Sequence, residues 1–260
     1  MPFKPMTSSS VALVTGAATG IGQSIAEQLH EAGYRVAITD INVEQAQKLA
    51  QRLSASGANA QAFKLDVRLQ SDIQSVFTQV EREMGPITML INNAGLYPNH
   101  PSLEMTETQW DDVFDTNLKG TFFCCQTFTQ AAVRNNIRGA IVNLASTSAF
   151  SARPGAAHYA ASKAGLVMLT KSLAQEFGAY GVRVNAVAPG LIEVGKANVS
   201  TAYRDQFTTM VPSGRTGTPA DIASVVSFLI SPAADYVNGE CIVVDGGFLT
   251  GRTLQRSKTS

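Results

Sequence analysis

A tyrosine and a lysine stand four residues apart in the segment Tyr159-Ala160-Ala161-Ser162-Lys163. In a helix this spacing places both side chains on one face. A free tyrosine has a pKa of about 10, too high for a base at neutral pH, but a neighbouring cation stabilises the phenolate. The pair is therefore a candidate general acid/base, although the spacing alone is common by chance.

Other polar residues stand where apolar segments end. Ser146 ends one such segment, thirteen residues before Tyr159, while Asn92-Asn93-Ala94-Gly95 and Asp66-Val67 end two others. Open α/β sheets bind ligands at the carboxyl ends of their strands. A hydroxyl group at Ser146 is thus a candidate for orienting a substrate oxygen and stabilising charge on it.

A glycine-rich turn follows the first apolar segment, in the sequence TGAATGIG of Thr15–Gly22. Its G-xxx-G-x-G spacing differs from the usual G-x-G-x-x-G dinucleotide fingerprint. Such a turn lets a pyrophosphate approach the backbone and the first N–H groups of the following helix. A purely structural turn is the alternative, which the position directly after a buried strand disfavours. Phosphate contacts are expected at Gly16, Thr19, Gly20, Ile21 and Gly22.

Asp40 ends the second apolar segment, 18 residues after Gly22. An acid at this distance accepts hydrogen bonds from the adenosine ribose hydroxyls. Capping of the next helix is the alternative role, because aspartate is a preferred N-cap. A carboxylate here would also repel the 2′-phosphate of NADP, so NAD is the expected cofactor.

The elements that must position these groups alternate along the chain. Nearly continuous apolar runs are typical of parallel strands buried on both faces, and strand–helix alternation indicates a doubly wound sheet. Helical periodicity marks Gly22–Ala32 and Val43–Ser56. We predict one Rossmann-like α/β domain over residues 1–260, with helices on both faces of about seven parallel strands. The predicted strands are Val11–Gly16, Arg35–Asp40, Ala60–Val67, Ile87–Asn93, Ala140–Ser146, Val182–Ala188 and Cys241–Asp245.

The amino-acid composition limits which classes of partner are expected. The chain has 20 basic and 20 acidic residues, so no net charge favours nucleic acid or an anionic membrane. No apolar stretch approaches the roughly 20 residues of a membrane span, and the N-terminus has no signal core. The three cysteines lack metal-ligand spacing. We expect a cytoplasmic protein with reduced thiols and no metal.

Together the motifs resemble the short-chain dehydrogenase/reductase family over essentially the whole chain. In family order they are TGAATGIG, Asp66-Val67, Asn92–Gly95, Asn117 in DTNLKG, Ser146, Tyr159–Lys163, Pro189-Gly190 after VRVNAVA, and Val243–Gly247. The resemblance implies an oxidoreductase that moves a hydride between a nicotinamide cofactor and the hydroxyl or carbonyl group of a small molecule. It also implies a homotetramer joined by long helices, expected near Trp110–Val133 and Tyr159–Ala179, and by C-terminal strands.

The resemblance also implies roles for single residues. Tyr159 is the proton donor or acceptor, Lys163 lowers its pKa and holds the nicotinamide ribose, and Ser146 anchors the substrate oxygen. Asn117 supports a water that links Lys163 to solvent, an ordinary helix asparagine being the alternative. His158 is expected to be a bystander. Further cofactor contacts are expected at Asp66, Val67, Asn93, Ala94, Pro189 and Ile192.

Three positions bear on the cofactor. Family members often have a threonine four residues after the glycine of Pro189-Gly190, where this chain has Val194, so the hydroxyl that contacts the nicotinamide amide in those proteins is missing. Family members that use NADP usually have a basic residue at one of two places, which here hold Thr19 and Ile41. The resemblance therefore also favours NAD, with Ile41 beside the adenosine.

The substrate is left open between classes. A small polar alcohol such as a sugar or polyol is favoured. We expect its site to be lined by a lid over Leu191–Arg215, which includes Glu193, and by four residues that follow predicted strands: Leu96, Tyr97, Ser148 and Arg153. A 3-oxoacyl-carrier-protein reductase is the alternative. Its relatives generally use NADPH and dock with two arginines, where this chain has Ile137 and Tyr180. A non-catalytic nucleotide-binding regulator would not need the Asn–Ser–Tyr–Lys set.

Overall fold

Seven parallel strands form one sheet in the order β3-β2-β1-β4-β5-β6-β7. The computed structural model describes residues 10–55, 59–194 and 201–251. The predicted fold class, a Rossmann-like doubly wound sheet of seven parallel strands, is confirmed. The strands are β1 (Val11–Thr15), β2 (Arg35–Asp40), β3 (Ala60–Lys64), β4 (Ile87–Asn92), β5 (Gly139–Leu144), β6 (Val182–Pro189) and β7 (Cys241–Val244).

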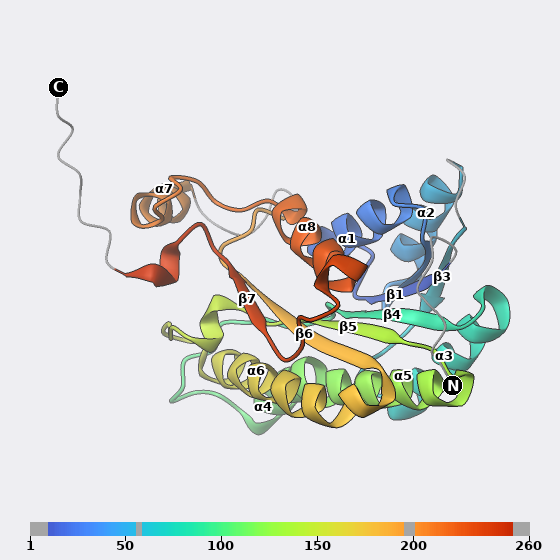
Figure 1. The fold of residues 1–260 in the computed structure, drawn as a ribbon. Coiled ribbons are helices and arrows are strands. Elements are labelled where there is room, and N and C mark those ends of the chain that lie inside the picture. Colours follow the sequence, from blue (N-terminus) through green and yellow to red (C-terminus); the bar gives the residue numbers. More distant parts are fainter. Residues whose placement is uncertain (1–9, 56–58, 195–200, 252–260) are drawn as a thin grey trace.

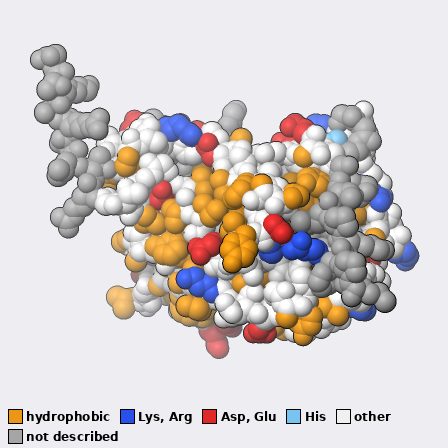
Figure 2. Space-filling view, in the orientation of Figure 1, with side chains coloured by type: hydrophobic (Ala, Val, Ile, Leu, Met, Phe, Trp, Pro, Cys, Tyr) orange, Lys and Arg blue, Asp and Glu red, His pale blue; other side chains and the backbone are white. Residues whose placement is uncertain are grey.

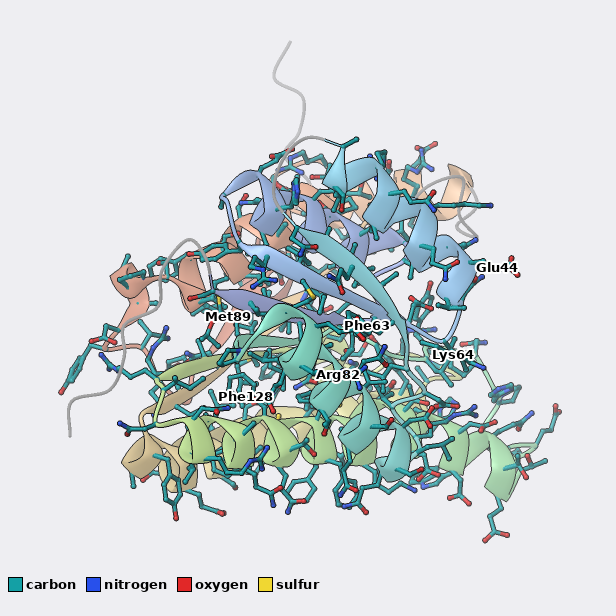
Figure 3. The ribbon with its side chains drawn as sticks, turned by 90° about the vertical axis from the view of Figure 1, so that its right-hand side faces the viewer. Glu44, Phe63, Lys64, Arg82, Met89 and Phe128 are labelled. Atoms are coloured by element: carbon teal, nitrogen blue, oxygen red, sulfur yellow. The ribbon has the colours of Figure 1, made fainter. Side chains whose placement is uncertain are left out.

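Helices cover both faces of the sheet (Figure 1). One face carries α1 (Gly20–Glu31), α2 (Val43–Ser54) and α8 (Pro219–Ile230). The other carries α3 (Gln70–Met84), α4 (Glu107–Phe114), α5 (Thr121–Asn135) and α6 (Ala157–Phe177). Two apolar cores result: Met89 lies in the first, and Phe63 and Phe128 lie in the second, where Phe128 extends from α5 towards the sheet (Figure 3).

The strand order reverses beside β1. This strand pairs with β2 on one side and with β4 on the other, so the connections that leave β1 and β4 diverge. Ligands of open α/β sheets bind in the crevice that such a reversal creates. Because β5 lies next to β4, the segments that follow β1, β4 and β5 meet at one edge of the sheet.

The predicted strand Ala60–Val67 is wrong at its end, because β3 stops at Lys64. A turn follows: the Leu69 N–H donates to the Asp66 carbonyl at 3.1 Å, and the Arg68 N–H donates to Asp66 Oδ1 at 3.0 Å. These local bonds compete with continuation of the strand. They leave Asp66 just beyond the sheet.

The long helix expected near Trp110–Val133 contains a π-helical segment, Asp115–Gly120, between α4 and α5. Such insertions are frequent at functional sites. A Cβ on Gly120 would lie 2.5 Å from the Val67 carbonyl oxygen, so only glycine lets the helix approach the turn after β3 so closely. Asn117 lies in this segment with no exposed surface.

The region Leu191–Arg215, which is expected to form a lid, contains the helix α7 (Thr201–Met210). A parallel bridge joins Ile192 to Gly217. Residues 195–200 and the basic tail 252–260 lie outside the described residues, so the lid stays a prediction. Within the described ranges, no helix has the length and apolar character needed to cross a membrane.

Candidate active site

The glycine turn is fastened to the end of β4. Thr15 Oγ1 accepts the N–H groups of Asn93 and Ala94, both at 3.0 Å. In return, Asn93 Nδ2 donates to the carbonyl oxygens of Thr15 and Gly16, at 3.0 and 2.7 Å. Asn93 and Ala94 were expected as cofactor contacts, and in the structure they hold the turn in place. The part played by Thr15 was missed, because a threonine at the end of a strand gives no specific signal.

Two glycines of the turn adopt left-handed backbone angles, with φ of +60° at Gly16 and +62° at Gly20. A Cβ on Gly22 would lie 2.4 Å from Asn93 Nδ2, so a side chain there would disrupt the turn. Thr19 is the N-cap of α1, yet its side chain makes no capping bond, and the first turn of α1 holds no acid. The first N–H groups of α1, which no side chain caps, fit a pyrophosphate group.

The segment that follows β6 returns to this turn. The Val194 side chain lies against Gly20, where a Cβ would be 3.3 Å from its Cγ1 atom. Pro189 ends β6, and the Gly190 N–H donates to the Val244 carbonyl at 3.0 Å. Ile192 lies between these residues and Val194, so this predicted contact stands near the phosphate turn.

Asp40 lies beside the glycine turn. Its Oδ2 accepts the Ala18 N–H at 3.0 Å, and its Oδ1 accepts the Asn42 N–H at 2.9 Å. The N-cap of α2 is Asn42, whose side chain accepts the Gln45 N–H, so helix capping is not the role of Asp40. The sheet register pairs Asp40 with Lys64 on β3, and the sequence pattern gives no sign of this pairing.

The other residues near Asp40 that we expect to contact the cofactor differ in whether they already have a partner. Arg68 donates to both carboxylate oxygens of Asp66, with Nη2 to Oδ2 at 2.7 Å, and this bonding lowers the pKa of Asp66. Val67 is buried, whereas Ile41 is 56% exposed beside Asp40. Ile41 is thus available to an adenosine group, while Asp66 already has an ionic partner.

Lys163 is a buried cation whose hydrogen bond goes to a backbone carbonyl. Its Nζ donates to the Leu144 oxygen at 2.5 Å, at the end of β5, and lies 5.9 Å from the centre of the Tyr159 ring. Burial lowers the pKa of Lys163 to about 8. The structure therefore brings together the predicted Tyr–Lys pair on one face of α6.

The Ser146 side chain lies close enough to Tyr159 to influence its pKa. Burial raises the pKa of Tyr159, whereas Ser146 and the charge of Arg153 act against that rise, and Tyr97 adds to it. We expected Lys163 to lower this pKa, but burial raises it, and Lys163 is not among the groups that shift it. Tyr97 and Arg153 come from the loops expected to line the site.

Asn117 joins the loop after β4 to α6. Its Oδ1 accepts the Leu96 N–H and its Nδ2 donates to the Leu96 carbonyl, both at 2.8 Å. Its Nδ2 also contacts Ser162 Oγ at 3.2 Å, and Ser162 Oγ donates to the Tyr159 carbonyl at 2.8 Å. These bonds disfavour the alternative of an ordinary helix asparagine. Ser162 lies within the Tyr–Lys motif, but the spacing of the motif gives no signal for this role.

Known proteins are similar to this chain in sequence and in fold. A family model described as "Enoyl-(Acyl carrier protein) reductase" matches residues 16–249. A 3-oxoacyl-[acyl-carrier-protein] reductase of Staphylococcus aureus is 41% identical, over 93% of this chain and 99% of that protein. A putative short-chain alcohol dehydrogenase of Sinorhizobium meliloti matches with 40% identity and a TM-score of 0.89, over 93% and 96% of the two chains.

A third similar protein was solved with ligands. It is a gluconate 5-dehydrogenase of Burkholderia cenocepacia in complex with NADP and tartrate. Its identity to this chain is 33% and the TM-score is 0.88, covering 93% of this chain and 96% of that one.

The buried Lys163 predicts a specific pH dependence of stability. Its pKa falls from 10.5 to about 8 on folding, so the folded state releases this proton earlier as pH rises. The unfolded state then binds more protons between about pH 8 and 10.5, and this residue makes unfolding less favourable with rising pH there, by up to about 3 kcal/mol.

Denaturant unfolding of the wild type and Lys163→Met across pH 7–11 measures this difference. The wild type should gain stability relative to Lys163→Met through this window. The exposed Lys171→Met on the same helix should follow the wild type. Parallel curves for the wild type and Lys163→Met would show that Lys163 is not a strained buried cation.

Proposed function

The chain belongs to the short-chain dehydrogenase/reductase family, and we propose that it moves a hydride between NAD(H) and the hydroxyl or carbonyl carbon of a small polar substrate. One observation carries the proposal. Tyr159 and Ser146 lie close together at the carboxyl edge of the sheet, with the buried Lys163 one helical turn from Tyr159.

The residues along this edge of the sheet fit a dinucleotide that is bound in one orientation. The glycine turn and the uncapped start of α1 would hold the pyrophosphate, Asp40 the adenosine ribose, and Ile192 the nicotinamide amide. The nicotinamide supplies the hydride acceptor or donor when it is bound. The protein then has to position the substrate and the nicotinamide and to supply a path for one proton.

Tyr159 supplies that proton path in the proposal. In carbonyl reduction its hydroxyl donates a proton to the substrate oxygen, and in alcohol oxidation its phenolate accepts one. Ser146 holds the same oxygen by a hydrogen bond. The Lys163 cation stabilises the phenolate when it forms, and Asn117 fixes the loop and helix that carry these groups.

The substrate is proposed to be small and polar instead of bound to a carrier protein. Ile137 is buried, and Tyr180 occupies the second position expected for a docking arginine. The adjacent Arg138 is paired with Asp235 at 2.9 Å, which leaves little positive charge for an acidic carrier. The similar gluconate 5-dehydrogenase supports a polyhydroxy substrate, whereas the Staphylococcus reductase favours the 3-oxoacyl alternative.

We also propose a homotetramer. Hydrophobic side chains gather over β7 and α8 on the face in Figure 2, where Phe228 is 43% and Val243 39% exposed. A second apolar surface follows the helices of the opposite layer, with Trp110, Val133 and Met168 exposed. Two separate apolar surfaces suit an assembly with two kinds of contact.

Light scattering at micromolar concentration should give a mass of four 27.5 kDa chains. Met168→Glu places a charge on the exposed side of α6 and should reduce that mass, because burying an unpaired charge is costly. Thr78→Glu, at an exposed position of α3, should leave the mass unchanged. A monomeric wild type would contradict the assembly.

Tyr159→Phe tests the proton role. The variant keeps the ring and loses only the hydroxyl, so turnover should fall by roughly 10²–10⁴-fold while NADH binding, followed by fluorescence, is retained. Tyr180→Phe is the matched control and should keep wild-type turnover. The assay uses the best substrate from a panel of sugars, polyols, sugar acids and 3-oxoacyl thioesters.

Two results of that assay would count against the proposal. A Tyr159→Phe enzyme with more than a tenth of the wild-type rate would remove Tyr159 from the chemistry. Turnover of the 3-oxoacyl thioesters alone would favour the carrier-protein alternative, and turnover of no panel member would contradict the activity.

Cofactor choice is tested with one shared substrate. The Asp40 carboxylate should repel a 2′-phosphate by roughly 1–4 kcal/mol at about 4 Å, so NAD(H) should exceed NADP(H) at least about tenfold in kcat/KM. Asp40→Ser should shrink that preference. Lys64→Gln should preserve or increase it, because it removes the cation opposite Asp40. Equal efficiencies in the wild type, or an NADP preference, would overturn the role of Asp40.

A further inference from the structure

The loops that follow β4 and β5 are joined beside Tyr159. The His100 N–H donates to the Gly155 carbonyl at 2.8 Å, and Arg153 Nη1 donates to Asn99 Oδ1 at 3.0 Å. Gly155 has φ of +74°, and a Cβ there would lie 2.4 Å from Asn99 Oδ1. The close approach that glycine allows thus fixes Asn99, and Asn99 in turn fixes the direction of the Arg153 side chain.

Arg153 differs from most other arginines of the described chain in its partners. Ion pairs with carboxylates hold the side chains of Arg52, Arg68, Arg82, Arg134, Arg138, Arg204 and Arg215. Arg153 is exposed and has no such partner among the residues that the structure describes. A guanidinium group has five N–H donors, of which Asn99 takes one. The others are available to an anion.

The charge of Arg153 acts on the reaction centre. It lowers the pKa of Tyr159 and that of His158, and no carboxylate is among the groups that shift either residue. His158 is fully buried and its ring nitrogens have no hydrogen-bond partner within the described residues. Burial, His100 and Arg153 lower the pKa of His158 and so favour its neutral form. Arg153 therefore supplies positive charge to the part of the site that the loops after β4 and β5 form.

We propose that Arg153 binds a carboxylate of the substrate, so that the enzyme acts on hydroxy acids or sugar acids in preference to neutral polyols. This inference rests on the proposed function, because it names the substrate of the same site. A guanidinium fork matches the two oxygens of one carboxylate. A single cation fits one carboxylate better than the dianionic phosphate of a phosphate ester, which usually recruits several donors.

Binding to the NAD⁺ complex tests the inference without turnover. Tartrate and threitol share four carbons and two inner hydroxyls, but tartrate ends in carboxylates where threitol ends in CH₂OH groups. Calorimetry should show tartrate binding at least about tenfold more tightly than threitol. Arg153→Gln should abolish that difference with threitol binding unchanged, Arg153→Lys should restore part of it, and Arg82→Gln on α3 should match the wild type.

The outcomes separate this inference from the proposed function. Equal binding of tartrate and threitol, or an unchanged preference in Arg153→Gln, would overturn the carboxylate site. Inorganic phosphate that binds more tightly than tartrate through Arg153 would overturn the choice of carboxylate. Oxidation of polyols and the corresponding sugar acids with equal kcat/KM would also overturn it while leaving the proposed function intact. Arg153-dependent tartrate binding with no oxidation of any panel member would support this site and contradict the activity.

A pH profile gives a second readout. Because Arg153 lowers the pKa of Tyr159, Arg153→Gln should move the corresponding limb of the kcat/KM profile to higher pH. A merely structural loss would lower the rate without moving that limb, which would contradict a direct influence of Arg153 on the reaction centre.

Discussion

The arrangement of the site depends on one buried hydrogen bond, from the ammonium group of Lys163 to the backbone carbonyl of Leu144. A buried cation without a carboxylate is costly, and its lowered pKa reflects that cost. The bond also sets geometry. Leu144 ends β5 two residues before Ser146, and Tyr159 lies one helical turn before Lys163 on α6. One contact between a helix and a strand thus brings the two hydroxyls together.

The cofactor side of the crevice is built differently, from backbone held by short polar side chains. Thr15 and Asn93 fasten the glycine turn to β4, and Asp40 fastens it to β2 through the Ala18 N–H. Each of these side chains bonds to main-chain atoms, and these bonds hold the shape of the turn. Charge enters the edge of the sheet mainly through Asp40 on this side and through Arg153 and Lys163 on the other.

Sequence patterns predicted the strands and helices well because buried parallel strands leave continuous apolar runs. The Tyr–Lys spacing and Asp40 were also identifiable, since helical periodicity and strand ends place them. Contacts between segments distant in sequence were not predictable: Asn99 against Gly155, Gly120 against the turn after β3, and Lys64 opposite Asp40. The direction of the Tyr159 pKa likewise depends on burial, which the spacing of two residues does not determine.

A crystal structure of the protein with NAD⁺ bound tests the central claim most directly, because it locates every part of the cofactor at once. We expect the pyrophosphate on the N-terminus of α1, the adenosine ribose on Asp40, and the nicotinamide ring beside Tyr159 and Lys163. A nicotinamide ring bound away from Tyr159, or an adenosine ribose that makes no bond to Asp40, would contradict this expectation.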